Sequence, residues 1–193
     1  MSASGGVAAL LDASVLVPAA LRDTLLRVAG AGLYRVAFSE LILDEVRRAL
    51  VANSLASVTS ADRLIENIHA YFWFALVAGD EPPDLELSTD PGDRHVLAAA
   101  IEAKVDIIVT ANLRHVPNSE LGPYGMTSMS PDQFLLMLAQ RDANALLQIV
   151  TQQAAALKSP PLSPADVLGR LRLHAPAFVE HLASLSDALR DDG

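Results

Sequence analysis

The sequence contains no cysteine. A chain without cysteine forms neither a disulfide scaffold nor a thiolate zinc or iron–sulfur site, and it offers no cysteine nucleophile. The absence also fits a reducing compartment, and we expect the protein to work in the cytoplasm.

Basic residues are few, with 14 lysines and arginines against 23 aspartates and glutamates and a formal net charge of −9. This balance argues against a protein that is held on nucleic acid by a broad basic face. It leaves open a nucleic-acid enzyme whose positive charge is a metal ion.

Long hydrophobic runs are also absent, although the mean hydropathy is +0.31. No run approaches the roughly 20 apolar residues that cross a bilayer. The first residues lack the basic segment of a signal peptide, and Asp12 interrupts the apolar stretch that follows. We therefore expect no signal peptide and no membrane contact.

The hydrophobic fraction is high, at 51%, and it is arranged in short segments. Apolar runs typical of buried strands alternate with amphipathic helices. This alternation favours a three-layer α/β/α fold with a mainly parallel central sheet. The predicted strands are Val7–Leu11, Tyr34–Phe38, Asp106–Thr110 and Met126–Met129, and the predicted helices are Pro18–Ala29, Ser39–Leu50, Arg63–Phe74, Asp93–Lys104 and Pro131–Gln140.

The end of the chain has a different pattern. Residues 142–157 are rich in Ala, Leu and Gln, and the segment Ser159–Pro164 (SPPLSP) breaks the helical pattern before it resumes. We predict an α/β domain over residues 1–140 and a C-terminal helical extension over residues 141–193.

Polar residues follow two of the predicted strands. Asp12 and Ser14 come after the first strand, and Thr110 and Asn112 come after the strand at 106–110. Sites in open parallel sheets form beyond the carboxyl ends of the strands, so these residues are candidates. A single Asp in this position can also simply cap the next turn.

Two further acids lie beside the apolar stripes of predicted helices. Glu45 borders a stripe that includes Ile42 and Val46, where a carboxylate is costly unless something pairs with it. Arg22 or Arg94 could be that partner, or the long side chain could reach water.

The second acid is Asp93, which precedes the stripe of the next helix by three and four residues. Asp90 and Asp93 could instead only cap that helix and complement its dipole.

Clustered carboxylates repel, by roughly 1 kcal/mol for a pair about 4 Å apart in water and by about 4 kcal/mol at an effective dielectric of 20. A cation relieves this repulsion, and oxygen ligands favour Mg²⁺ or Mn²⁺ over zinc. Such sites commonly serve phosphate chemistry. The candidate oxygen donors are Asp12, Glu45, Asp93, Asp90 and Asn112.

Three blocks of the sequence together resemble a PIN domain. They are LLDASVLVPAALRDTLLRVA, SELILDEVRRAL and DPGDRHVLAAAIEAKVDIIVTANLRHVP, and the resemblance runs from about Val7 to Gln140. Within the family the chain looks most like the VapC-type toxins that carry an extra C-terminal helical segment. The resemblance implies a metal-dependent endoribonuclease that is cytoplasmic, forms a homodimer and is blocked by a cognate antitoxin protein.

The family's three core acids correspond to Asp12, Glu45 and Asp93, which would hold Mg²⁺ or Mn²⁺ with Asp90 as a further ligand. Asn112 matches the strand-end block of the catalytic set. The sequence departs from the family three residues later, where His115 stands in place of an Asp. The resemblance therefore leaves open whether a second metal ion binds.

The other residues of the predicted site have supporting roles. Ser14 and Thr110 would orient the metal-binding acids without contacting the metal themselves. Arg22 and Arg94 would bind phosphate of the RNA substrate, because arginine binds phosphate bidentately. A salt bridge to a nearby acid is the alternative for both arginines.

Other function classes fit less well. A HAD-type phosphatase needs a second Asp at position 14, where Ser14 stands, and a response-regulator receiver needs adjacent acids after its first strand. A catalytically degenerate PIN scaffold that only binds a protein or RNA partner stays open because of His115.

We expect His69 and the aromatic run Tyr71–Phe74 to belong to the core or an interface.

Overall fold

The computed structural model describes residues 6–79 and 94–191. The chain divides into two compact units. The sheet unit comprises Met1–Val17 and Tyr34–Ser128, and the helical unit comprises Pro18–Leu33 and Met129–Gly193. The predicted boundary at residue 140 stays a prediction.

The sheet has five strands in the order β3-β2-β1-β4-β5. β1 is central and pairs in parallel with both β2 and β4, and β2 pairs in parallel with β3. Every residue of β1 is buried, as expected for the middle strand of a covered sheet. The strands are β1 (Ala8–Leu11), β2 (Arg35–Ser39), β3 (Leu76–Val77), β4 (Ile107–Val109) and β5 (Thr127–Met129).

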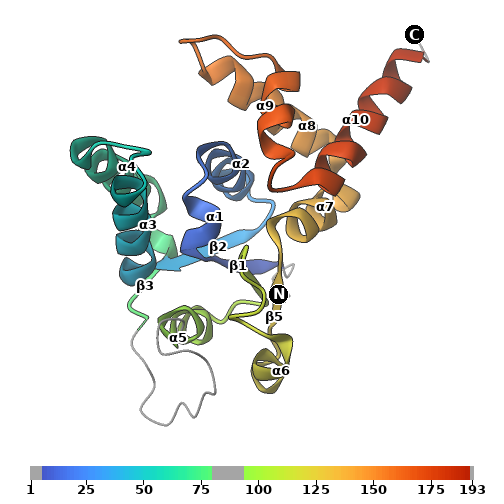
Figure 1. The fold of residues 1–193 in the computed structure, drawn as a ribbon. Helices are drawn as coiled ribbons and strands as arrows, with labels where there is room; N and C mark the ends of the chain where they lie inside the picture. The colour runs from blue at the N-terminus through green and yellow to red at the C-terminus, as the bar shows by residue number, and fades with distance from the viewer. Residues whose placement is uncertain (1–5, 80–93, 192–193) are drawn as a thin grey trace. The chain divides into compact units, whose positions relative to one another are not determined.

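Helices cover both faces of this sheet: α3 and α4 lie on one side and α5 on the other (Figure 1). The predicted three-layer α/β/α class is confirmed. The helices of the sheet unit are α1 (Ala13–Leu16), α3 (Glu40–Ala52), α4 (Val58–Phe72), α5 (Arg94–Ala103) and α6 (Asn118–Leu121), with 3₁₀ turns η1 (Trp73–Ala75) and η2 (Gly122–Tyr124).

Several short elements of the sheet unit were not predicted, namely α1, β3, α6 and η2. The short helix α1 forms because the Asp12 side chain caps it, accepting from the Ser14 backbone N–H. The edge strand β3 has only two residues, too few for a periodic pattern to reveal.

Three aromatic side chains at the end of α4 are exposed, which corrects the prediction of a core location, whereas the predicted interface location stays a prediction. Tyr71 is 75% exposed, Trp73 73% and Phe74 61%. The chain turns there through η1 before it enters the edge strand β3, so these rings lie at a margin of the unit. Phe72 alone of the run stacks edge-on against buried Phe38, with ring centroids 6.4 Å apart.

The helical unit packs around fully buried Phe134 and Phe178. A buried polar contact joins its first helix to a C-terminal one, with the Thr24 hydroxyl donating to Gln153 Oε1 at 2.7 Å. The predicted C-terminal helices are therefore present. The unit consists of α2 (Ala19–Gly30), α7 (Pro131–Arg141), α8 (Ala143–Ala156), α9 (Pro164–Leu171) and α10 (Pro176–Asp191).

Among the described residues, none of the helices has the length and apolar character needed to cross a membrane.

Candidate functional site

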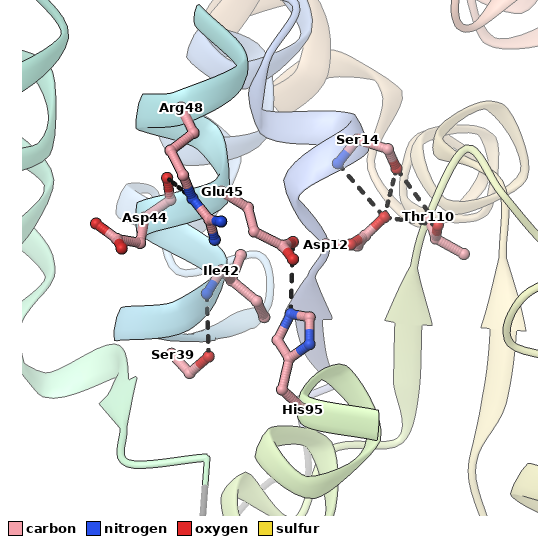
Figure 2. A network of polar contacts seen from close by, with 9 residues as sticks. All are labelled: Asp12, Ser14, Ser39, Ile42, Asp44, Glu45, Arg48, His95 and Thr110. Atoms are coloured by element: carbon pink, nitrogen blue, oxygen red, sulfur yellow. Dashed lines mark hydrogen bonds and ion pairs between the residues drawn. The ribbon is translucent and has the colours of Figure 1, made fainter. Parts of the chain in front are cut away.

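The core of the candidate site is a carboxylate held by two hydroxyl groups. β1 ends at Leu11 and β4 at Val109, and the Asp12 backbone N–H donates to the Val109 carbonyl at 3.1 Å. Asp12 and Thr110 therefore emerge side by side at the carboxyl edge of the sheet. Asp12 Oδ2 accepts from the Ser14 hydroxyl at 2.5 Å and from the Thr110 hydroxyl at 2.8 Å (Figure 2).

These contacts fix the orientation of the Asp12 carboxyl group. Thr110 is only 1% exposed, so its hydroxyl is shielded from competing water. All the hydrogen bonds to the carboxylate end on Oδ2, including one from the Ser14 backbone N–H at 3.4 Å. Within the described ranges, Oδ1 has no hydrogen-bond partner. An oriented carboxylate with one uncommitted oxygen suits a hard cation.

Glu45 projects from α3 toward the same region. Its side chain is 36% exposed, and Oε2 lies 3.4 Å from Nε2 of His95 on α5. Figure 2 shows the Glu45 carboxylate above the His95 ring, with the Asp12 carboxylate pointing toward it from the end of β1. α3 packs against both α1 and α5, which explains why the three side chains converge.

The ion pair between Arg94 and Glu45, which was one predicted alternative, does not form. The Arg94 Nε atom is buried and has no hydrogen-bond partner among the described residues. His95 takes that position instead. The two residues are adjacent at the start of α5, so only their orientation on the helix distinguishes them.

Asn112 joins the cluster through its backbone. Its N–H donates to the Thr110 hydroxyl at 3.0 Å, and the neighbouring Ala111 N–H donates to the Ser14 hydroxyl at 3.0 Å. The Asn112 side chain is exposed, and residues 111–115, which include His115, line an open pocket. The catalytic role of the Asn112 side chain stays a prediction.

Asp90 and Asp93 lie outside the described residues. In the ranges 6–79 and 94–191, no three histidine, aspartate or glutamate side chains are close enough to hold a metal ion. The described part of the site therefore supplies two carboxylates, Asp12 and Glu45. Asp93 directly precedes α5, the helix that carries His95.

Arg22 lies on α2, in the helical unit. Burial is the main cause that lowers the pKa of its guanidinium, and the neighbouring Asp23 carboxylate partly opposes this. The group nevertheless stays charged at neutral pH. Its role in phosphate binding, like that of Arg94, stays a prediction.

From its place two residues after Asp93, the sequence predicts that His95 flanks the site in a surface or capping role, and the structure corrects the surface part of this prediction. Its side chain is only 14% exposed, and its Nε2 atom is buried. The sequence placed it near the site, two residues after Asp93, but no local pattern indicated that its ring would face α3.

Two family models match the chain in succession. The PIN domain matches residues 8–114, and the VapC50 C-terminal domain matches residues 131–184. A protein of Mycobacterium tuberculosis (strain ATCC 25618 / H37Rv) named "Putative ribonuclease VapC50" is 37% identical over 86 residues, which are 45% of this chain and 51% of that protein. The match thus spans about half the length of the relative. No solved structure matches the chain significantly.

Proposed function

The chain belongs to the PIN domain family, and from this we propose that it is a metal-dependent endoribonuclease, the toxin of a toxin–antitoxin pair. The observation that carries the proposal is the oriented Asp12 carboxylate, whose Oδ1 accepts no hydrogen bond from the described residues and lies on the same side as Glu45. The name of the mycobacterial relative and the match to the VapC50 C-terminal domain support the same activity.

In this proposal Asp12, Glu45 and Asp93 hold Mg²⁺ or Mn²⁺, with Asp90 as a further ligand. The donor set fits such an ion because the Asp12 and Glu45 carboxylates supply hard oxygen ligands, and the described residues leave Asp12 Oδ1 without a hydrogen bond and Glu45 with one contact. When bound, the ion lowers the pKa of an attacking water and offsets the charge of the phosphodiester.

The protein's own residues position the reacting groups. Ser14 and Thr110 keep the Asp12 carboxylate from rotating, so that no ordering is needed when substrate arrives. Asn112 belongs to the catalytic set and, together with Ser14 and Thr110, orients the metal ligands. Arg22 and Arg94 bind phosphate oxygens of the RNA.

The net charge of −9 disfavours non-specific RNA binding, so we expect a narrow range of RNA targets. We further propose that the protein forms a homodimer, is inhibited by a cognate antitoxin and acts in the cytoplasm. We also propose that residues 1–140 form the nuclease domain and residues 141–193 a helical extension.

A second candidate is a catalytically degenerate PIN scaffold that binds a protein or RNA partner. The observation in its favour is His115, which is exposed, lines the pocket and stands at a position where the family has an Asp. Such a scaffold would bind divalent metal poorly, because too few carboxylates face the ion.

The test is cleavage of total cellular RNA by the purified protein, in Mn²⁺ and in EDTA, with Asp93→Ala as the matched variant. We expect discrete fragments that require both the metal and Asp93. Fragments that persist in EDTA or in the variant would contradict the proposal. Absence of both cleavage and Mn²⁺ binding would support the degenerate scaffold.

A further inference from the structure

We infer that His95 is a positioning residue, which holds the Glu45 carboxylate turned toward Asp12 and so presets the spacing of the two metal-binding acids. The inference rests on the proposed metal-dependent activity, and it concerns a residue that neither the sequence pattern nor the family match assigns to the site.

The geometry of the contact supports this role. His95 Nε2 lies 3.4 Å from Glu45 Oε2, and the His95 side chain is only 14% exposed. The Nε2 atom is buried and has no hydrogen bond to any described residue that meets normal geometry. A buried polar atom without such a bond is costly, so it needs an explanation from its surroundings.

Glu45 is the polar group that Nε2 faces. Figure 2 shows the ring edge directed at the Glu45 carboxylate, which in turn lies on the side of α3 that faces Asp12. The contact needs a hydrogen on Nε2, and one neutral tautomer supplies it as well as the imidazolium does. A small rotation of the Glu45 side chain would make the hydrogen bond to His95 short and direct, as often happens when a site binds its ligand.

Each of the two acids, Asp12 and Glu45, is held by its own polar contacts. Asp12 has the Ser14 and Thr110 hydroxyls, and Glu45 has His95. Without His95, the flexible Glu45 side chain would be free to turn toward water, because it is already 36% exposed. A metal ion would then have to order the Glu45 side chain when it binds, and this ordering would weaken the affinity for the metal.

A second histidine–glutamate pair in the sheet unit offers a matched comparison. His69 Nε2 on α4 lies 3.1 Å from Glu40 Oε2 on α3, with exposed fractions of 38% for His69 and 62% for Glu40. Glu40 lies at the first residue of α3, more than a helical turn before Glu45. His69→Met therefore removes a similar contact on the same helix without touching the site.

The experiment measures Mn²⁺ affinity by titration calorimetry for the wild type, His95→Met, His95→Gln and His69→Met. Methionine fills similar space without a donor, whereas glutamine keeps an N–H near the position of Nε2. We expect Mn²⁺ binding about 10-fold or more weaker in His95→Met, restored in large part in His95→Gln and unchanged in His69→Met. Thermal unfolding of each variant confirms that it is folded.

The role through Glu45 is tested by combining variants. In a Glu45→Gln background, we expect His95→Met to cause no further loss of Mn²⁺ affinity, because the group that it positions is altered. A His95→Met protein that binds Mn²⁺ like the wild type overturns the inference, as does a His95→Gln protein that is as weak as His95→Met.

The same series separates this inference from the proposed function. If the wild type binds Mn²⁺, cleaves RNA and loses both in Asp12→Asn, while His95→Met retains full affinity, only the role of His95 is wrong. If the wild type itself binds no Mn²⁺, both the proposed function and the role of His95 are overturned.

Discussion

Asp12 and Glu45 point toward the same region, but they are held in different ways. Asp12 is fixed by two side-chain hydrogen bonds, of 2.5 and 2.8 Å, from groups that follow adjacent paired strands. Glu45 has one polar contact with the residues that the structure describes, at 3.4 Å from His95, and it crosses from α3 to α5. The sheet edge therefore gives a rigid ligand, whereas the pair of helices gives one whose position depends on side-chain packing.

The largest expected effect comes from Asp12→Asn, which removes the charge of the rigid ligand. We expect RNA cleavage to fall to background while the fold is retained, because asparagine caps a helix about as well as aspartate does. Cleavage of labelled RNA and thermal unfolding of the same preparation measure the two quantities. Cleavage at the wild-type rate would show that Asp12 is not a ligand.

Thr110→Val tests whether the rigidity of Asp12 matters. The substitution keeps the shape of a side chain that is 1% exposed, but it removes the donor to Asp12 and the acceptor for the Asn112 N–H. We expect a loss of about 1–3 kcal/mol in unfolding free energy, measured by urea denaturation, and Mn²⁺ binding about 10-fold weaker.

Thr110→Ser is the matched control, since it keeps the hydroxyl and should retain most of the metal affinity. If the Thr110→Val and Thr110→Ser proteins bind Mn²⁺ equally well, the Thr110 hydroxyl does not orient Asp12. Asp12 would then not be held more rigidly than Glu45 by this contact.

The smallest effect is expected for Arg47→Ala on α3. The Arg47 guanidinium pairs with Asp62 at 2.5 Å, and the hydrogen bond to Asp62 raises the pKa of Arg47. Both side chains are more than a third exposed, so solvent screens the pair and its loss should hardly change stability. RNA cleavage and Mn²⁺ affinity should match the wild type. A clear loss of either would mean that the site responds to any disturbance of α3, rather than to Glu45 in particular.

Much of the fold could be predicted from local hydrophobic patterns in the sequence. The apolar runs that became β1, β2, β4 and β5 are each short, and their ends agree with the prediction within one or two residues. The two-residue strand β3 was missed, and Tyr71, Trp73 and Phe74 are exposed rather than in the core, which was one of the two locations predicted for them. Hydrophobicity alone does not tell whether an aromatic side chain at the end of a helix is covered, because the cover comes from elsewhere in the chain.

Local sequence patterns are enough to predict the α/β class, the position of Asp12 directly after a buried strand and the position of Glu45 beside an apolar helix stripe. These follow from periodicity and from the cost of burying a charge, which act over a few neighbouring residues. The hydrogen bond from Thr110 to Asp12, 98 positions away, and the approach of His95 to Glu45 arise from three-dimensional packing. Strand order and helix packing set these contacts, and both depend on the balance of burial over the whole unit.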